Sequence, residues 1–113
     1  TFHDISVLTC MTNDYGYDVT YQKLLENFSN ENDCLIAISS SGNSLNIINA
    51  TEKFRELNPK GKIITLSGFS QDNQLRNKGD LNFWIDSKSY GIVEIAHQFI
   101  LHFFADKIHQ EKS

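Results

Sequence analysis

A cluster of hydroxyl side chains follows a short apolar segment in the first half of the chain. These side chains belong to Ser39, Ser40, Ser41 and Ser44. Hydroxyls can donate hydrogen bonds to phosphate oxygens, and the first turn of a following helix would add unpaired amides and a partial positive charge. No Lys or Arg lies in 39–44, so a bound anion would be held by hydrogen bonds and the helix dipole. The run therefore predicts a phosphate site, with helix capping and turn formation as the structural alternative.

A second candidate feature is a polar stripe near the C-terminal end of the chain. It consists of Glu94, Gln98, His102 and Asp106, each four residues apart in an otherwise apolar segment. Residues at this spacing share one face of a helix. Histidine changes charge near neutral pH, which suits the transfer of a proton between adjacent carbons. The stripe could equally be the solvent face of an amphipathic helix, and both interpretations stand at this point.

The geometry of this helix limits which residues can act together. Eight residues separate Glu94 from His102, or about 12 Å along the axis at 1.5 Å per residue. The two side chains could therefore meet only on a small object between them, such as a metal ion or part of a sugar. His97 lies about 140° around the helix from His102 at 100° per residue. We expect His97 to be a packing or interface histidine.

Strands and helices alternate along the sequence that carries these residues. Strands are predicted at 5–10, 34–39, 62–66 and 81–86, and helices at 17–27, 45–57, 71–78 and 90–108. Such alternation indicates βαβ units and a parallel sheet covered by helices on both faces. Ligands of such sheets bind beyond the carboxyl ends of the strands, which is where the serine run lies.

Bulk properties exclude several classes of protein. A chain of 113 residues is one domain at most, and its net charge of −4 argues against nucleic acid as the ligand. No apolar stretch approaches the length of a membrane span, and no G-x-G-x-x-G motif of a dinucleotide site is present.

Cys10 and Cys34 lie in apolar runs without metal-type spacing. They fit free thiols in a reducing compartment, so we expect a cytoplasmic protein that does not bind membranes.

Two sequence segments resemble a known family. The segment ISSSGNSLNIINA, from Ile38 to Ala50, resembles the phosphate loop of the sugar isomerase (SIS) domain, a flavodoxin-like αβα sandwich. The upstream segment NDYGY, from Asn13 to Tyr17, is similar to one typical of the phosphoheptose isomerase branch, which interconverts sedoheptulose 7-phosphate and a heptose 7-phosphate. The resemblance covers nearly the whole of 1–113. It implies a sugar-phosphate isomerase that interconverts an aldose and a ketose.

The resemblance also implies roles for individual residues. Ser39, Ser41 and Ser44 would bind the sugar phosphate with help from Ser40, while Asn13 and Asp14 would hydrogen-bond the sugar hydroxyls. His102 would be the acid/base residue. Glu94 occupies the position of a glutamine that, with this histidine, coordinates zinc in some members, so zinc is the cofactor to consider. The family pattern further implies a homo-oligomer, a dimer or tetramer, built around the last helix.

The sequence departs from the family pattern in two places. The family begins with helices and a glycine-rich strand-loop-helix that supplies a catalytic glutamate and a further histidine, and residues 1–113 do not include this part of the pattern. We therefore expect 1–113 to be a fragment of an SIS domain. Glutamate at position 94 also changes the charge of the site. The alternative function is a non-catalytic SIS module that binds a sugar phosphate or a protein partner as a regulator or scaffold.

Overall fold

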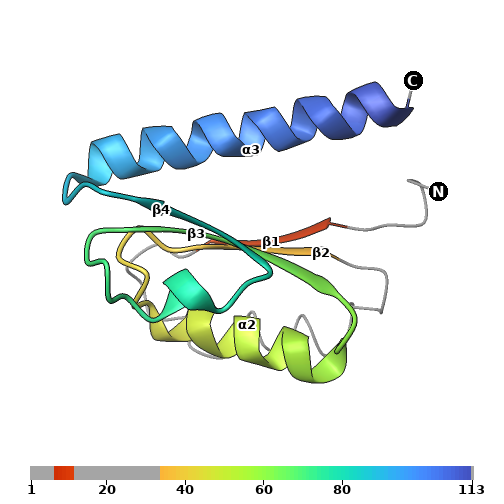
Figure 1. Cartoon of the computed structure of the whole chain (residues 1–113), viewed down its shortest axis with the longest axis horizontal. Helices are drawn as coiled ribbons and strands as arrows, with labels where there is room; N and C mark the ends of the chain where they lie inside the picture. Colours follow the sequence, from red (N-terminus) through yellow and green to blue (C-terminus); the bar gives the residue numbers. More distant parts are fainter. Residues whose placement is uncertain (1–6, 12–33, 113) are drawn as a thin grey trace.

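The computed structural model describes residues 7–11 and 34–112, which form a parallel sheet with helices on both faces (Figure 1). The strands are β1 (Val7–Met11), β2 (Cys34–Ile38), β3 (Lys62–Gly68) and β4 (Leu81–Ile85). They lie in the order β1-β2-β3-β4, and each neighbouring pair is parallel. Helix α2 (Leu45–Leu57) covers one face and helix α3 (Tyr90–Lys112) the other. The predicted three-layer α/β arrangement is confirmed for the described residues.

Two apolar clusters join the helices to the sheet. Because successive side chains of a strand point to opposite faces, the apolar run of β2 contributes to both clusters. On the α2 side, the buried residues are Leu35, Ala37, Ile47, Ala50, Phe54, Ile63 and Leu75. On the α3 side they are Ile36, Ile38 and Leu66, with Ile64, Phe83, Ile100 and Leu101 packed against them. The sheet therefore fixes the starting points of both helices relative to the carboxyl ends of the strands.

One predicted element is wrong, and the boundaries of others move. The helix predicted at 71–78 is only a short 3₁₀ turn, η2 (Leu75–Asn77). The side chain of Asn73 bonds to carbonyl groups of this loop, which holds the backbone away from a regular helix. Helix α3 runs four residues further than predicted, to Lys112, and β3 extends two residues further, to Gly68. The helix predicted at 17–27 lies outside the described residues.

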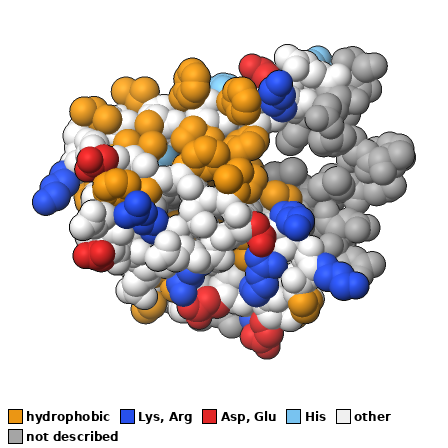
Figure 2. Space-filling view, viewed as in Figure 1, with side chains coloured by type: hydrophobic (Ala, Val, Ile, Leu, Met, Phe, Trp, Pro, Cys, Tyr) orange, Lys and Arg blue, Asp and Glu red, His pale blue; other side chains and the backbone are white. Residues whose placement is uncertain are grey.

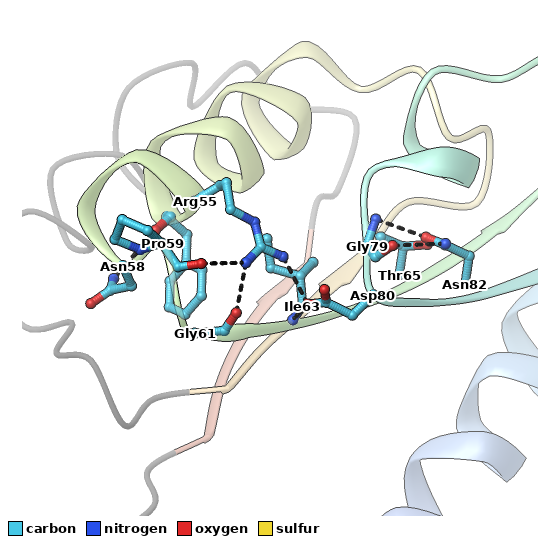
Figure 3. A network of polar contacts seen from close by, with 10 residues as sticks. Arg55, Asn58, Pro59, Gly61, Ile63, Thr65, Gly79, Asp80 and Asn82 are labelled. Carbon is cyan, nitrogen blue, oxygen red and sulfur yellow. Dashed lines mark hydrogen bonds and ion pairs between the residues drawn. The ribbon is translucent and has the colours of Figure 1, made fainter.

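A polar network joins α2, β3 and β4 at the end of the sheet away from the serine loop (Figure 3). The Arg55 guanidinium donates from Nη2 to Asp80 Oδ2 at 2.7 Å and from Nη1 to the Gly61 carbonyl at 2.7 Å. Asp80 Oδ2 also accepts from the Ile63 amide at 2.9 Å. The carboxylate of Asp80, directly before β4, thus links α2 to the beginning of β3. The hydrogen bond from Arg55 is the main reason that the pKa of Asp80 lies below its ordinary value of 3.8.

We predict that Asp80→Asn lowers the free energy of unfolding at pH 7 by about 0.5–1 kcal/mol, a small effect because this pair is exposed to solvent and screened. The lowered pKa fixes the sign of the pH dependence. The stabilisation is present above the unfolded-state pKa and is lost as the pH falls through the lower folded-state pKa. Urea unfolding at pH 7 and near pH 3 measures the difference. Glu56→Gln is the control, since the Glu56 side chain is 72% exposed and its ion pair with Lys53 stays within α2. An equal loss for both variants at pH 7 would contradict the role of Asp80.

Candidate functional site

The serine side chains converge on one another directly after β2. Ser39 is almost fully buried, and its Oγ donates to Ser44 Oγ at 3.1 Å and lies 3.5 Å from Ser41 Oγ. The amide of Gly42 donates to Ser39 Oγ at 3.0 Å, and the amide of Asn43 donates to Ser41 Oγ at 3.1 Å. Three hydroxyls from a six-residue segment are therefore gathered at the start of α2. Such a group can donate hydrogen bonds to several oxygens of one anion.

The helix-capping alternative does not account for Ser44. It is the N-cap residue of α2, with extended backbone angles of φ −69° and ψ 115°, but its side chain makes no capping hydrogen bond. Its hydroxyl accepts from Ser39 instead and lies within the loop. The first turn of a helix carries amides that need partners, and a side-chain cap would normally supply one. The Ser44 hydroxyl therefore contributes to the serine loop and not to a side-chain cap of α2.

Gly42 and Asn73 hold the loop in this shape. Gly42 has a positive φ of 71°, which L side chains rarely adopt, and a Cβ at this position would lie 2.0 Å from Asn73 Oδ1. The loop after β3 is bonded to the serine loop next to this contact. The Leu75 amide donates to the Gly42 carbonyl at 2.9 Å, and the Gln74 amide donates to Asn43 Oδ1 at 3.0 Å. Asn73 was not predicted as a site residue, because nothing in the sequence reveals that it packs against a loop thirty residues away.

The two residues expected to carry the chemistry lie on α3, separate from the serine loop in this chain. Glu94 and His102 are both exposed, as are Gln98 and Asp106 of the same stripe. Helix α3 begins beside the carboxyl ends of the strands and runs back across the sheet (Figure 1). At 1.5 Å per residue, His102 stands about 18 Å from the start of α3, whereas Glu94 stands about 6 Å from it. The structure thus brings the serines together but does not bring His102 to them.

The described residues do not by themselves form a zinc centre. No group of three or more His, Cys, Asp or Glu side chains among residues 7–11 and 34–112 could hold a metal ion. Structural and catalytic zinc sites need at least three protein ligands, and Glu94 with His102 would supply two. A zinc site that includes them would need a further ligand from elsewhere.

The remaining residues of interest lie in the core or outside the described part. Asn13 and Asp14, predicted to contact the sugar, lie outside the described residues. His97 is buried, as predicted for a packing histidine, and Cys34 is a partly buried free thiol whose pKa is raised by desolvation. Trp84 is half-buried under the guanidinium of Arg76, which lies 4.2 Å from the ring centroid.

Among the described helices, none is both long and apolar enough to cross a membrane.

Sequence comparisons place this chain beside enzymes of one kind. No family model matches it. It is 35% identical over 106 residues to the phosphoheptose isomerase of Helicobacter pylori, a match that covers 93% of this chain and 53% of the relative. It is 37% identical over 110 residues to the phosphoheptose isomerase of Yersinia pestis, covering 96% of this chain and 55% of the relative. The chain thus spans about half the length of the relatives it matches.

Solved structures agree with the sequence matches. A phosphoheptose isomerase from Francisella tularensis superposes with a TM-score of 0.74 at 30% identity, over 86% of this chain and 51% of that one. A phosphoheptose isomerase from Neisseria gonorrhoeae superposes with a TM-score of 0.79, over 96% of this chain and 78% of that one. The second match is 20% identical and is evidence for the fold alone.

The fold and the serine loop define an α/β domain with its candidate site at a strand-to-helix junction of a parallel sheet. Within this class the chain is homologous to the phosphoheptose isomerases, over nearly all of its own length. The resemblance expected from the serine loop and the segment NDYGY is confirmed.

We predict that Gly42→Ala destabilises the protein by at least about 1 kcal/mol, because alanine is strained at positive φ, and that the contact with Asn73 adds to this cost. The same variant should lose measurable binding of inorganic phosphate in calorimetry, since the loop cannot keep its shape. Gly91→Ala is the matched control. Its Cβ would meet only Ser89 Oγ at 3.9 Å, and alanine favours a helix by up to about 1 kcal/mol. Retention of both stability and phosphate binding in Gly42→Ala would contradict the assigned role of Gly42.

Proposed function

We propose that the natural protein is a sugar-phosphate isomerase of the phosphoheptose isomerase type. Its substrate would be sedoheptulose 7-phosphate or a closely similar keto-sugar phosphate, converted to the corresponding aldose. The observation that carries the proposal is the group of three hydroxyls at the start of α2, in which Ser39 Oγ lies 3.5 Å from Ser41 Oγ and 3.1 Å from Ser44 Oγ. The named activity of the homologous proteins supports the same reading.

The serine loop would anchor the phosphate end of the sugar. Ser39, Ser41 and Ser44 are assigned as donors to phosphate oxygens, with Ser40 and the amides of the loop beside them. The loop carries no positive side chain. Each hydrogen bond would therefore supply a larger share of the phosphate-binding free energy than it would beside a lysine or arginine. Asn13 and Asp14 are assigned to the sugar hydroxyls by the family resemblance.

Isomerisation then requires a proton to leave one carbon next to the carbonyl and to reach the neighbouring carbon, with a second proton exchanged between the two oxygens. No oxidant or reductant is needed. His102 is assigned as one proton carrier, and Glu94 as the residue that orients the sugar beside it. The other proton carrier would come from a part of the protein outside the described residues.

A homo-oligomer is part of the proposal, because His102 is exposed on α3 and does not meet the serine loop of its own chain. An apolar stripe runs along the exposed side of α3 next to these residues (Figure 2), and Ile95 and Phe99 are 72% and 73% exposed. A shallow apolar hollow of about 550 Å³ lies between this stripe and β4. A second copy that covers the stripe would remove these apolar side chains from water. The proposed location is the cytoplasm, on the sequence argument from the cysteines.

The phosphate assignment predicts a loss of affinity in the double variant Ser41→Ala with Ser44→Ala. Binding of the sugar phosphate should weaken by a few kcal/mol, at about 1–1.5 kcal/mol for each lost neutral hydrogen bond and more for a charged acceptor. Isothermal calorimetry measures the change. Ser70→Ala, which removes an exposed hydroxyl from the neighbouring loop, should bind as the wild type does. If the double variant binds as tightly as Ser70→Ala, the loop is structural.

The catalytic assignment predicts that His102→Asn lowers turnover by about 10²–10⁴, the usual contribution of a positioned acid/base group. Its KM should stay close to that of the wild type, since the serine loop anchors the substrate. Glu94→Gln separates two roles of Glu94: retained activity means that an uncharged acceptor suffices, and lost activity means that the charge is required. Full activity of His102→Asn would remove this assignment. Absence of any isomerase activity in the natural protein would instead favour the non-catalytic binding module.

The oligomer predicts that a charge on the apolar stripe dissociates the protein. Phe99→Glu should shift the sedimentation coefficient from that of a dimer or tetramer toward that of a monomer, because the carboxylate would have to be buried without a partner. Gln98→Glu adds the same charge one residue away, on the polar stripe, and should sediment as the wild type does. A wild-type protein that is monomeric at micromolar concentration would refute the proposal.

A further inference from the structure

The carboxyl end of β3 touches both the serine loop and helix α3. The amide of Ser39 donates to the Leu66 carbonyl at 3.0 Å. A Cβ added to Gly68 would lie 3.0 Å from the Ser40 carbonyl oxygen and 2.8 Å from both methyl groups of Val93. The serine loop and α3 therefore pack against the same short segment of one strand.

His97 is the polar residue of α3 at this junction. It is 3% exposed, and its Nε2 lies 3.0 Å from the Ser67 carbonyl oxygen. A carbonyl can only accept, so Nε2 carries the proton and the neutral ring has Nδ1 as its acceptor. Nδ1 is also buried and has no hydrogen-bond partner among the described residues. Desolvation lowers the pKa of His97 below its ordinary value of 6.5, which keeps the ring neutral.

Ser67 continues the connection to the serine loop. Its Oγ accepts from Asn73 Nδ2 at 3.2 Å, and the same amide nitrogen donates to the Gly68 carbonyl at 3.1 Å. Asn73 in turn occupies the space beside Gly42. A continuous buried path thus runs from His97 through Ser67 and Asn73 to Gly42.

We infer that His97 is a positioning residue, which holds α3 in a fixed register against the serine loop through the Ser67 carbonyl. The inference rests on the proposed function, since it concerns the distance between the anchored phosphate and the helix that carries Glu94. A buried imidazole with one unpaired nitrogen is costly, and a leucine would fill the same position without an unpaired ring atom. Stability alone therefore does not favour histidine here. The hydrogen bond to Ser67 specifies where the helix lies, which packing of apolar side chains defines less sharply.

Two substitutions separate positioning from stability. His97→Leu removes the donor and keeps the bulk, whereas His97→Gln can place an N–H where Nε2 lies. In the natural protein, His97→Leu should keep the wild-type melting temperature or raise it, while kcat falls by about 10–100-fold, because a displacement of about 1 Å at a catalytic group costs up to about 10²-fold. KM should change less than threefold. His97→Gln should restore most of kcat. His109→Gln, an exposed histidine of the same helix, is the control.

The outcomes decide between positioning, a direct catalytic role and a role in folding alone. Wild-type kcat in His97→Leu would overturn the inference. Equal loss in both His97 variants, together with loss of one limb of the pH–rate profile, would mean that His97 itself transfers the proton and would also overturn it. If the wild-type protein shows no isomerase activity, the proposed function fails, and amide NMR of the same variants decides the inference. Shifts at Gly42 and Asn43 in His97→Leu, and not in His97→Gln, support it; unshifted loop signals in His97→Leu contradict it.

Discussion

The contact between Gly42 and Asn73 is the constraint on which the candidate site depends. Gly42 reaches a positive φ because it has no Cβ, and the space that a Cβ would fill belongs to the Asn73 side chain. This close approach turns the chain so that Ser39, Ser41 and Ser44 share one small region at the start of α2. Without the turn, the hydroxyls would follow the strand and point to different sides.

This constraint matters because the loop contains no cation. A site with lysine or arginine attracts an anion over several ångströms, even when its geometry is imperfect. A site made of hydroxyls and amides needs its donors in place beforehand, because each neutral hydrogen bond contributes only about 1 kcal/mol net. The loop after β3 holds these donors in place. Its Asn73 side chain is fixed by hydrogen bonds of both the amide nitrogen and the amide oxygen. The fixed geometry of the serine loop thus compensates for the absence of a positively charged side chain in 39–44.

The sequence was sufficient to predict the layers of the fold and the position of the serine loop. The apolar run of β2 and the helical spacing of α2 are local patterns, and both elements appear close to their predicted bounds. The helix predicted at 71–78 failed because the amides of Gln74 and Leu75 donate to the serine loop, a tertiary contact that local propensity does not contain. The link of His97 to Ser67 was equally hidden, since it joins residues thirty positions apart. Spacing alone places Glu94 and His102 on one face of α3, and that face is exposed in the described part of the chain.

A crystal structure of the natural protein with bound sedoheptulose 7-phosphate tests the central claim most directly, because it locates the phosphate and the reacting carbons together. We expect phosphate oxygens within hydrogen-bond distance of the Ser39–Ser44 loop. We also expect the carbonyl end of the sugar beside a His102 side chain, contributed by the same subunit or by a neighbouring one. A sugar phosphate bound elsewhere, with the serine loop unchanged and its hydroxyls still bonded to one another at saturating ligand, would contradict the account.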